Sequence, residues 1–126
     1  MTRLSHFLWL CVWLGLAFYL ALTLWLGLTG IAYPYQLDYG EGDVHWFALQ
    51  IFHGQAIYKA LTVFPFMSSN YPPVAMLLSA ALMPIFGEGF TGGRLLNFAA
   101  MLITTALIYR VVRVESKDRW AAALAA

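Results

Sequence analysis

Three of the six acidic residues in this chain, Asp38, Glu41 and Asp43, lie in one short stretch between long apolar runs. Glycines and a tyrosine separate the three carboxylates, which predicts a compact turn instead of a solvated charged surface. A carboxylate held in this way at the edge of a membrane can take a proton from a substrate as a general base. We therefore expect chemistry in this turn.

The same acids also have structural interpretations. Asp43 is well placed to cap a helix that begins there, and Asp38 can cap the turn in the same way. Glu41 stands between two glycines and has less structural reason to be there, which favours a functional role. A metal site built from these acids and His45 is a further alternative, although a single interfacial histidine is more often solvated. We therefore assign no metal ligands and no certain cofactor, with a divalent metal ion as the alternative.

The composition indicates a membrane protein. Hydrophobic residues make up 62% of the chain and charged residues 10%, as is typical of chains that are embedded in lipid. The net charge of +1 provides no basic face for nucleic acid, so we exclude nucleic-acid binding. Cys11, the one cysteine, falls inside the first apolar run and cannot form an intrachain disulfide.

The first apolar run, Phe7–Thr29, contains no charged residue. Its roughly 23 residues make a helix of about 34 Å, which is enough to cross a hydrocarbon core of about 30 Å. This run is longer than the apolar core of a cleaved signal sequence, which has about 7–15 residues. Arg3 predicts a cytoplasmic amino terminus, and aromatic residues mark the far, exoplasmic interface: Trp25, Tyr33 and Tyr35.

The segment Asp43–His53 has the spacing of an amphipathic helix. From Val44 onward, apolar residues recur at i, i+3, i+4, i+7 and i+8 and form one face. About eleven residues are too few to span a bilayer, so we expect this helix to lie along the interface, with its apolar face toward lipid or toward the spans. Gly54 should end the helix, and residues 59–70 should form a loop.

Two further apolar segments follow. The prolines of Asn70–Pro73 favour an extended entry and then a helix start. Residues 72–87 are predicted to form a second span, which is short at roughly 15 residues or about 22 Å. Residues 94–113 form a third span after a Gly92-Gly93 break, and Arg94 is expected to anchor it at the interface. The polar residues of this span should face another helix: Asn97, Thr104 and Thr105.

Together these segments predict an all-α, multi-pass membrane protein. It has about three transmembrane helices and an interfacial amphipathic helix in the first exoplasmic loop, residues 30–71. Residues 120–126 open another apolar segment at the end of the chain. We therefore expect the chain to be a fragment that ends at the start of a fourth span.

Five short motifs follow one another along the chain: DYGE at 38–41, GQAIY at 54–58, NYPP at 70–73, FG at 86–87 and GGR at 92–94. In this order they resemble the amino-terminal part of the GT-C membrane glycosyltransferases. That superfamily includes dolichyl-phosphate-mannose-dependent protein mannosyltransferases, lipid A aminoarabinose transferases and related bacterial sugar transferases. The series in register carries the resemblance, which covers nearly the whole chain.

The resemblance implies transfer of a sugar from a polyprenyl-phosphate donor to a lipid, glycan or protein acceptor. The reaction would take place on the exoplasmic face of a membrane, most simply the bacterial plasma membrane. A loop carboxylate, Asp38 or Glu41, would be the general base. Relatives with adjacent Asp and Glu have Gly40-Glu41 here, with the aspartate at Asp38, so which carboxylate acts stays open. The resemblance further implies substrate contacts at five positions: Asp43, His45, Lys59, Asn70 and Tyr71.

The leaving group in such a reaction is a lipid phosphate, whose charge needs cations, N–H donors or a metal ion. Lys59, Arg94, His45 and His53 are the candidates in this sequence. We expect most of the phosphate-binding groups beyond residue 126, and the fragment alone to be inactive.

Charge bias conflicts with three alternating spans. If the loop at Asp38 is exoplasmic, three crossings would also place four basic residues outside, Arg110, Arg113, Lys117 and Arg119, against the positive-inside rule. Either the short second segment does not cross, or these residues are held outside to contact lipid phosphate. We favour the plain crossing, because the resemblance places the next span directly after such a basic turn.

A function of another class is a small, non-catalytic membrane subunit whose acidic loop binds an ion or a partner. Three spans and an amphipathic helix suit such a role, and acids at the membrane edge also mark ion paths.

Overall fold

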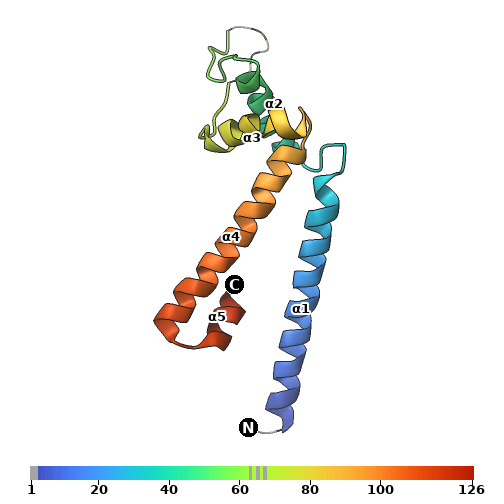
Figure 1. The fold of residues 1–126 in the computed structure, drawn as a ribbon, viewed down its shortest axis with the longest axis vertical. Coiled ribbons are helices and arrows are strands. Elements are labelled where there is room, and N and C mark those ends of the chain that lie inside the picture. Colours follow the sequence, from blue (N-terminus) through green and yellow to red (C-terminus); the bar gives the residue numbers. More distant parts are fainter. Residues whose placement is uncertain (1–2, 63, 65, 67) are drawn as a thin grey trace. The chain divides into compact units, whose positions relative to one another are not determined.

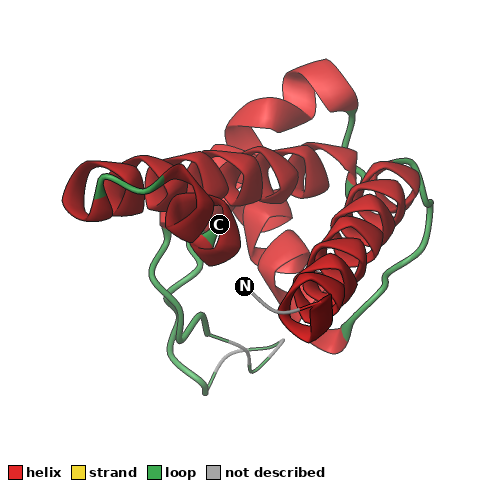
Figure 2. Ribbon diagram, turned by 90° about the horizontal axis from the view of Figure 1, so that it is seen from below, coloured by secondary structure: helices red, strands yellow, loops and turns green. Residues whose placement is uncertain are grey.

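The computed structural model describes residues 3–62, 64, 66 and 68–126, and every regular element in that part is an α-helix. Figure 2 shows these helices joined by loops. The chain divides into two compact units, Met1–Tyr33 and Pro34–Ala126. The predicted all-α class is therefore confirmed for the described residues.

The first unit contains one helix, α1, which runs over Arg3–Ile31 (Figure 1). Its 29 residues give a length of about 44 Å, more than the hydrocarbon core of about 30 Å. None of its residues is buried within the described structure, so its apolar side chains need lipid or protein around them. The hydroxyl of Thr29 donates to the carbonyl of Trp25 at 2.8 Å, which satisfies this polar group inside the helix. The predicted span 7–29 lies within α1.

The second unit contains α2 (Tyr39–Phe52), α3 (Val74–Phe86), α4 (Thr91–Ser116) and α5 (Arg119–Ala125). Helix α2 packs on α3, α3 packs on α4, and α5 folds back on α4. In Figure 1, α2 and α3 lie at the end of the unit where α4 begins, and α5 lies where α4 ends. The long helix α4 therefore separates two regions of this unit.

Helix α2 begins four residues earlier than predicted, with Asp38 at the N-cap position. Glu41 is the third helical residue, and its carboxylate accepts the backbone N–H of Leu37 at 2.8 Å. A side chain of the first turn that reaches back in this way resembles the second half of a capping box. This contact stabilises the first turn of α2, although that turn contains Gly40 and Gly42, which disfavour helix. Asp43 thus lies inside the helix, and its predicted role as N-cap is wrong.

The small core of the unit lies between α2 and α3. Phe47 and Ala48 from α2 are buried against Met76, Ala80 and Met83 from α3. The predicted apolar face of α2 is therefore turned toward another helix, which was one of the two predicted alternatives. Gly54, with a φ of +70°, follows the helix as predicted, because this left-handed conformation favours glycine.

Helix α4 begins at Thr91, so Gly92 and Gly93 lie in its first turn and do not break it. A Cβ atom on Gly92 would lie 3.2 Å from Cβ of Leu82, and one on Gly93 would lie 3.4 Å from Oγ of Ser79. The missing side chains let α4 approach α3 closely, as small residues do where membrane helices meet.

Two of the described helices, α1 and α4, are long and apolar enough to cross a membrane. Helix α3 has 13 residues, or about 20 Å. That residues 72–87 form a further span therefore stays a prediction.

The predicted loop 59–70 contains no helix among its described residues; residues 63, 65 and 67 lie outside them. Two hydrogen bonds tie the ends of the loop together. The N–H of Ser69 donates to the carbonyl of Ile57 at 2.9 Å, and the hydroxyl of Tyr58 donates to the carbonyl of Tyr71 at 2.9 Å.

Candidate functional site

A cavity of about 360 Å³ lies where the start of α2, the middle of α3 and the start of α4 meet. Its size is at the lower end of the range for small-molecule sites, about 300–1,000 Å³. The polar and charged residues that line it come from all three helices: Asp38, Glu41, His45, Ser79, Arg94 and Asn97. The acidic turn that the sequence predicted as the reactive element therefore forms one wall of a cavity.

The strongest contact in this cavity joins Glu41 to Arg94. Nε of Arg94 lies 2.6 Å from Oε1 of Glu41, and Nη2 lies 2.9 Å from Oε2. Nη2 also donates to the carbonyl of Tyr35 at 2.7 Å. Arg94 is buried, with 8% of its side chain exposed; that it anchors the third span at the interface stays a prediction. The pair fastens the first turn of α2 to the start of α4, and the contact with Tyr35 fastens the segment before α2 as well.

These contacts change the acid–base properties of Glu41. The hydrogen bonds from Arg94 hold the pKa of Glu41 below its usual range; partial burial opposes this effect, and the N–H of Leu37 adds to it. A carboxylate whose ionised form is stabilised in this way is a weaker base. Glu41 is therefore well suited to hold Arg94 and poorly suited to accept a proton.

Asp38 lines the same cavity and has different surroundings. It occupies the N-cap position of α2, but its side chain makes no capping hydrogen bond within the described structure. Its side chain is exposed. Of the two predicted base candidates, Asp38 is thus the one that Arg94 does not hold.

His45 packs its ring against Phe90, with the ring centroids 4.3 Å apart. Burial lowers the pKa of His45, while the charge of Glu41 and a hydrogen bond to the backbone of Glu88 oppose this shift. The lowered pKa favours the neutral imidazole. Together the two rings add an aromatic surface to a cavity that is also lined by polar side chains, glycines and the aliphatic side chains of Val44 and Met83.

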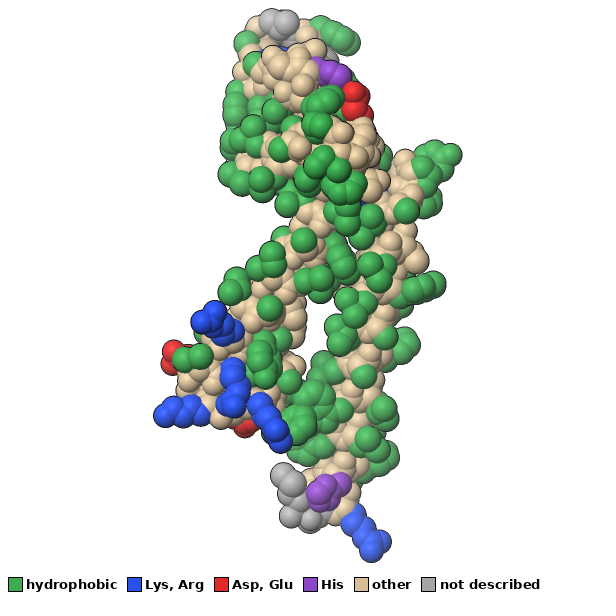
Figure 3. All heavy atoms as spheres, viewed as in Figure 1, with side chains coloured by type: hydrophobic (Ala, Val, Ile, Leu, Met, Phe, Trp, Pro, Cys, Tyr) green, Lys and Arg blue, Asp and Glu red, His purple; other side chains and the backbone are tan. Residues whose placement is uncertain are grey.

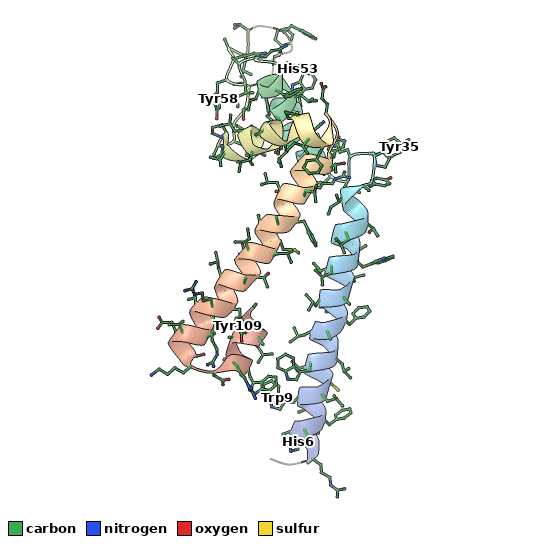
Figure 4. The ribbon with its side chains drawn as sticks, viewed as in Figure 1. His6, Trp9, Tyr35, His53, Tyr58 and Tyr109 are labelled. Carbon is green, nitrogen blue, oxygen red and sulfur yellow. The ribbon has the colours of Figure 1, made fainter. Side chains whose placement is uncertain are left out.

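The other predicted substrate contacts do not reach the cavity. Asp43, Lys59, Asn70 and Tyr71 are absent from its described lining. The ammonium group of Lys59 donates to Oε1 of Gln50 at 3.1 Å, in the second half of α2. Figure 4 shows Tyr58 near the end of α2 that is remote from Asp38. The predicted set of site residues therefore divides into a group in the cavity and a group outside it.

Sequence reasoning missed Ser79 and Phe90 as site residues, and it gave Arg94 only an anchoring role. Arg94 and Asn97 are three residues apart and thus share one face of α4. This spacing is visible in the sequence and could have indicated that both residues line the same site. Asn97 lines the cavity between the helices, in line with the prediction that it faces another helix.

No group of three or more His, Cys, Asp or Glu side chains that could hold a metal ion occurs in the described part of the chain. The alternative site built from Asp38, Glu41, Asp43 and His45 is therefore not assembled in this structure.

Comparison with known families gives a match to the second part of the chain. Residues 70–126 match the model of a family described as dolichyl-phosphate-mannose-protein mannosyltransferase. Comparisons with curated proteins and with solved structures gave no match. The matched range contains the NYPP and GGR motifs, Arg94 and Asn97, and begins after the acidic turn. Over residues 70–126 the chain is thus similar to the dolichyl-phosphate-mannose-protein mannosyltransferases.

Proposed function

We propose that the chain is part of a membrane glycosyltransferase in which Asp38 is the general base. The enzyme transfers a sugar from a polyprenyl-phosphate donor to an acceptor hydroxyl on the exoplasmic face. The observation that carries the assignment is that the two acids of this cavity have different partners. Glu41 is held by Arg94, while the side chain of Asp38 makes no capping hydrogen bond within the described residues.

The proposed step is a single inverting displacement. The acceptor oxygen attacks the anomeric carbon and forms the new glycosidic bond, while the bond from that carbon to the phosphate oxygen breaks. The proton of the acceptor hydroxyl passes to the carboxylate of Asp38, and the lipid phosphate leaves with the electron pair. General-base catalysis of this kind contributes roughly 10²–10⁴-fold in rate.

Glu41 and Arg94 have a positioning role in this proposal. Their pair fixes the first turn of α2 against α4, and Asp38 directly precedes that turn. Because the guanidinium is already neutralised by Glu41, we propose that the leaving phosphate is stabilised by cationic groups outside this cavity.

The size and lining of the cavity suit one sugar ring. Asn97 and Ser79 offer hydrogen bonds to hydroxyl groups, and the rings of His45 and Phe90 offer an apolar surface to the C–H face of a sugar. This combination of a few polar groups with an aromatic wall is typical of small-molecule sites.

The test compares two isosteric variants introduced at the chromosomal locus, with transfer measured in membranes isolated from those cells. A radiolabelled polyprenyl-phosphate sugar serves as the donor. Asp38→Asn should lower turnover by at least about a hundredfold, because it keeps the shape of the side chain and removes its basicity. Donor binding and the amount of protein in the membrane should change little.

Asp43→Asn is the matched control, since Asp43 lies outside the described lining of the cavity. It should leave transfer close to that of the unaltered protein. If Asp43→Asn abolished transfer while Asp38→Asn stayed active, the assignment of the base to Asp38 would be wrong.

A further inference from the structure

The loop between α3 and α4, residues 87–90, forms part of the cavity wall and has only two side chains with which to hold its place. Gly89 and Phe90 line the cavity. Gly87 has a φ of +81°, and a Cβ atom added to either glycine would meet nothing within 4 Å. Between its two ends, the position of the loop therefore depends on the contacts of Glu88 and Phe90.

Both of these side chains contact a histidine, one inside α2 and one at its C-cap. The ring centroid of Phe90 lies 4.3 Å from that of His45, and Oε2 of Glu88 lies 3.4 Å from Nε2 of His53. His45 also forms a hydrogen bond with the backbone of Glu88. Figure 3 shows histidine and acidic side chains next to each other on the surface at the end of the unit where α2 and α3 pack. The loop is thus held from the side of α2.

The two contacts differ in strength because they differ in exposure. The side chains of His53 and Glu88 are 52% and 54% exposed, and exposed ion pairs contribute little to stability. His45 and Phe90 are both partly buried, and an aromatic pair stabilises beyond the area that it buries. The guanidinium carbon of Arg94 lies 5.0 Å from the centroid of the same Phe90 ring. Phe90 is therefore held by α4 and by α2 together, and His45 supplies the contact from α2.

We infer that His45 is a positioning residue, which sets the place of the α3–α4 loop through Phe90 and so shapes the wall against which the sugar of the donor binds. The identity of this ligand rests on the proposed function, whereas the contacts that hold the loop do not. An apolar wall binds the sugar ring alike before and during transfer. Loss of His45 therefore weakens donor binding and leaves the chemical step intact, whereas loss of the base at Asp38 does the opposite.

A measurement without substrate tests whether His45 holds the loop. In the chain with Cys11→Ser, purified in detergent, a nitroxide on Glu88→Cys reports the mobility of the loop and removes the weak pair with His53. In this background His45→Ala should narrow the spectrum, while alanine preserves α2 itself. His45→Phe keeps a ring against Phe90 and should leave the spectrum broad. His53→Gln is the matched control and should change nothing, because its partner is already absent. An unchanged spectrum in His45→Ala, or equal narrowing in either other variant, would overturn the inference.

The kinetic test uses membranes from cells that carry each variant at the chromosomal locus, with the radiolabelled polyprenyl-phosphate sugar titrated as donor. His45→Ala should raise KM for this donor by about three- to tenfold, the size of one lost aromatic contact, and leave kcat nearly unchanged. His45→Phe should restore KM. A fall in kcat without a rise in KM, or an unchanged KM in His45→Ala, would overturn the positioning role. Full turnover in Asp38→Asn, together with a raised KM in His45→Ala, would contradict the base assignment alone and support this inference.

Discussion

Asp38 and Glu41 are three residues apart and differ in their surroundings, because Arg94 binds the carboxylate of Glu41. The guanidinium binds both carboxylate oxygens of Glu41, and this contact stabilises the ionised form. Asp38 lines the same cavity, and its side chain makes no capping hydrogen bond within the described residues. The identity of the base, left open by the sequence, is thus argued from the partner of one side chain.

The lowered pKa of Glu41 predicts an acid-sensitive contribution to stability. A carboxyl group whose pKa is lower in the folded protein contributes stability that is fully present above the unfolded value, about 4.5, and is lost as the pH falls through the folded value. We therefore expect the melting temperature of the purified chain in detergent to drop between pH 6 and pH 3, and this drop to be smaller in Glu41→Gln. Glu115→Gln, which removes an exposed acid, is the control and should keep the full drop. Equal slopes for Glu41→Gln and the unaltered chain would contradict the role of the pair.

At the scale of the elements, apolar runs and helical spacing were enough to predict that these helices exist, while their ends were harder to predict. Gly40 and Gly42 looked like breakers, so α2 was predicted to begin at Asp43. The Asp38-x-x-Glu41 spacing of a capping box was the signal that corrects this start. Gly92 and Gly93 also looked like a break, but they serve as a contact surface inside α4. A glycine that permits close packing and one that ends a helix are alike in a single sequence.

This contact predicts a difference between two neighbouring glycines. Gly92→Ala places a Cβ atom 3.2 Å from Cβ of Leu82, so α3 and α4 must move apart slightly. Gly89→Ala is the matched control, because a Cβ atom there meets nothing within 4 Å. We expect Gly92→Ala to destabilise the chain by about 1–3 kcal/mol, as overpacking does, and Gly89→Ala to be close to neutral. Thermal unfolding in detergent, followed by circular dichroism, measures both; equal melting temperatures would show that α3 and α4 are not tightly packed here.

At the scale of the whole molecule, the sequence predicted a multi-pass, all-helical membrane protein and could not decide how many times the chain crosses. The apolar run 72–87 reads the same whether it crosses a bilayer or lies on its surface. In the structure, α3 of this run packs on α2 and α4. The contact between Glu41 and Arg94 was equally hidden, because the tertiary pairing of two residues so far apart leaves no local pattern.

The basic turn should set the orientation of the molecule. Replacing Arg110, Arg113 and Lys117 together with Gln removes most of the positive charge beside the end of α4. Because the charge bias of short flanking segments determines how spans insert, we expect a lower fraction of chains with Gln55→Cys accessible to an impermeant reagent. Replacing Lys59 with Gln in the loop after α2 is the control for a changed charge elsewhere and should preserve accessibility. An unchanged fraction in the triple variant would mean that α1 alone determines orientation.

The separation of 53 residues between Glu41 and Arg94 also orders events during biosynthesis. The ribosome releases Glu41 first, so the acidic turn is made while its partner is still missing. Arg94 follows in the first turn of α4 and pairs with a carboxylate that already exists. The cavity therefore forms only after α4 has been inserted. A chain in which that insertion fails would display an unpaired glutamate and an uncovered α3, the kind of defect by which membrane proteases distinguish unfinished proteins from finished ones.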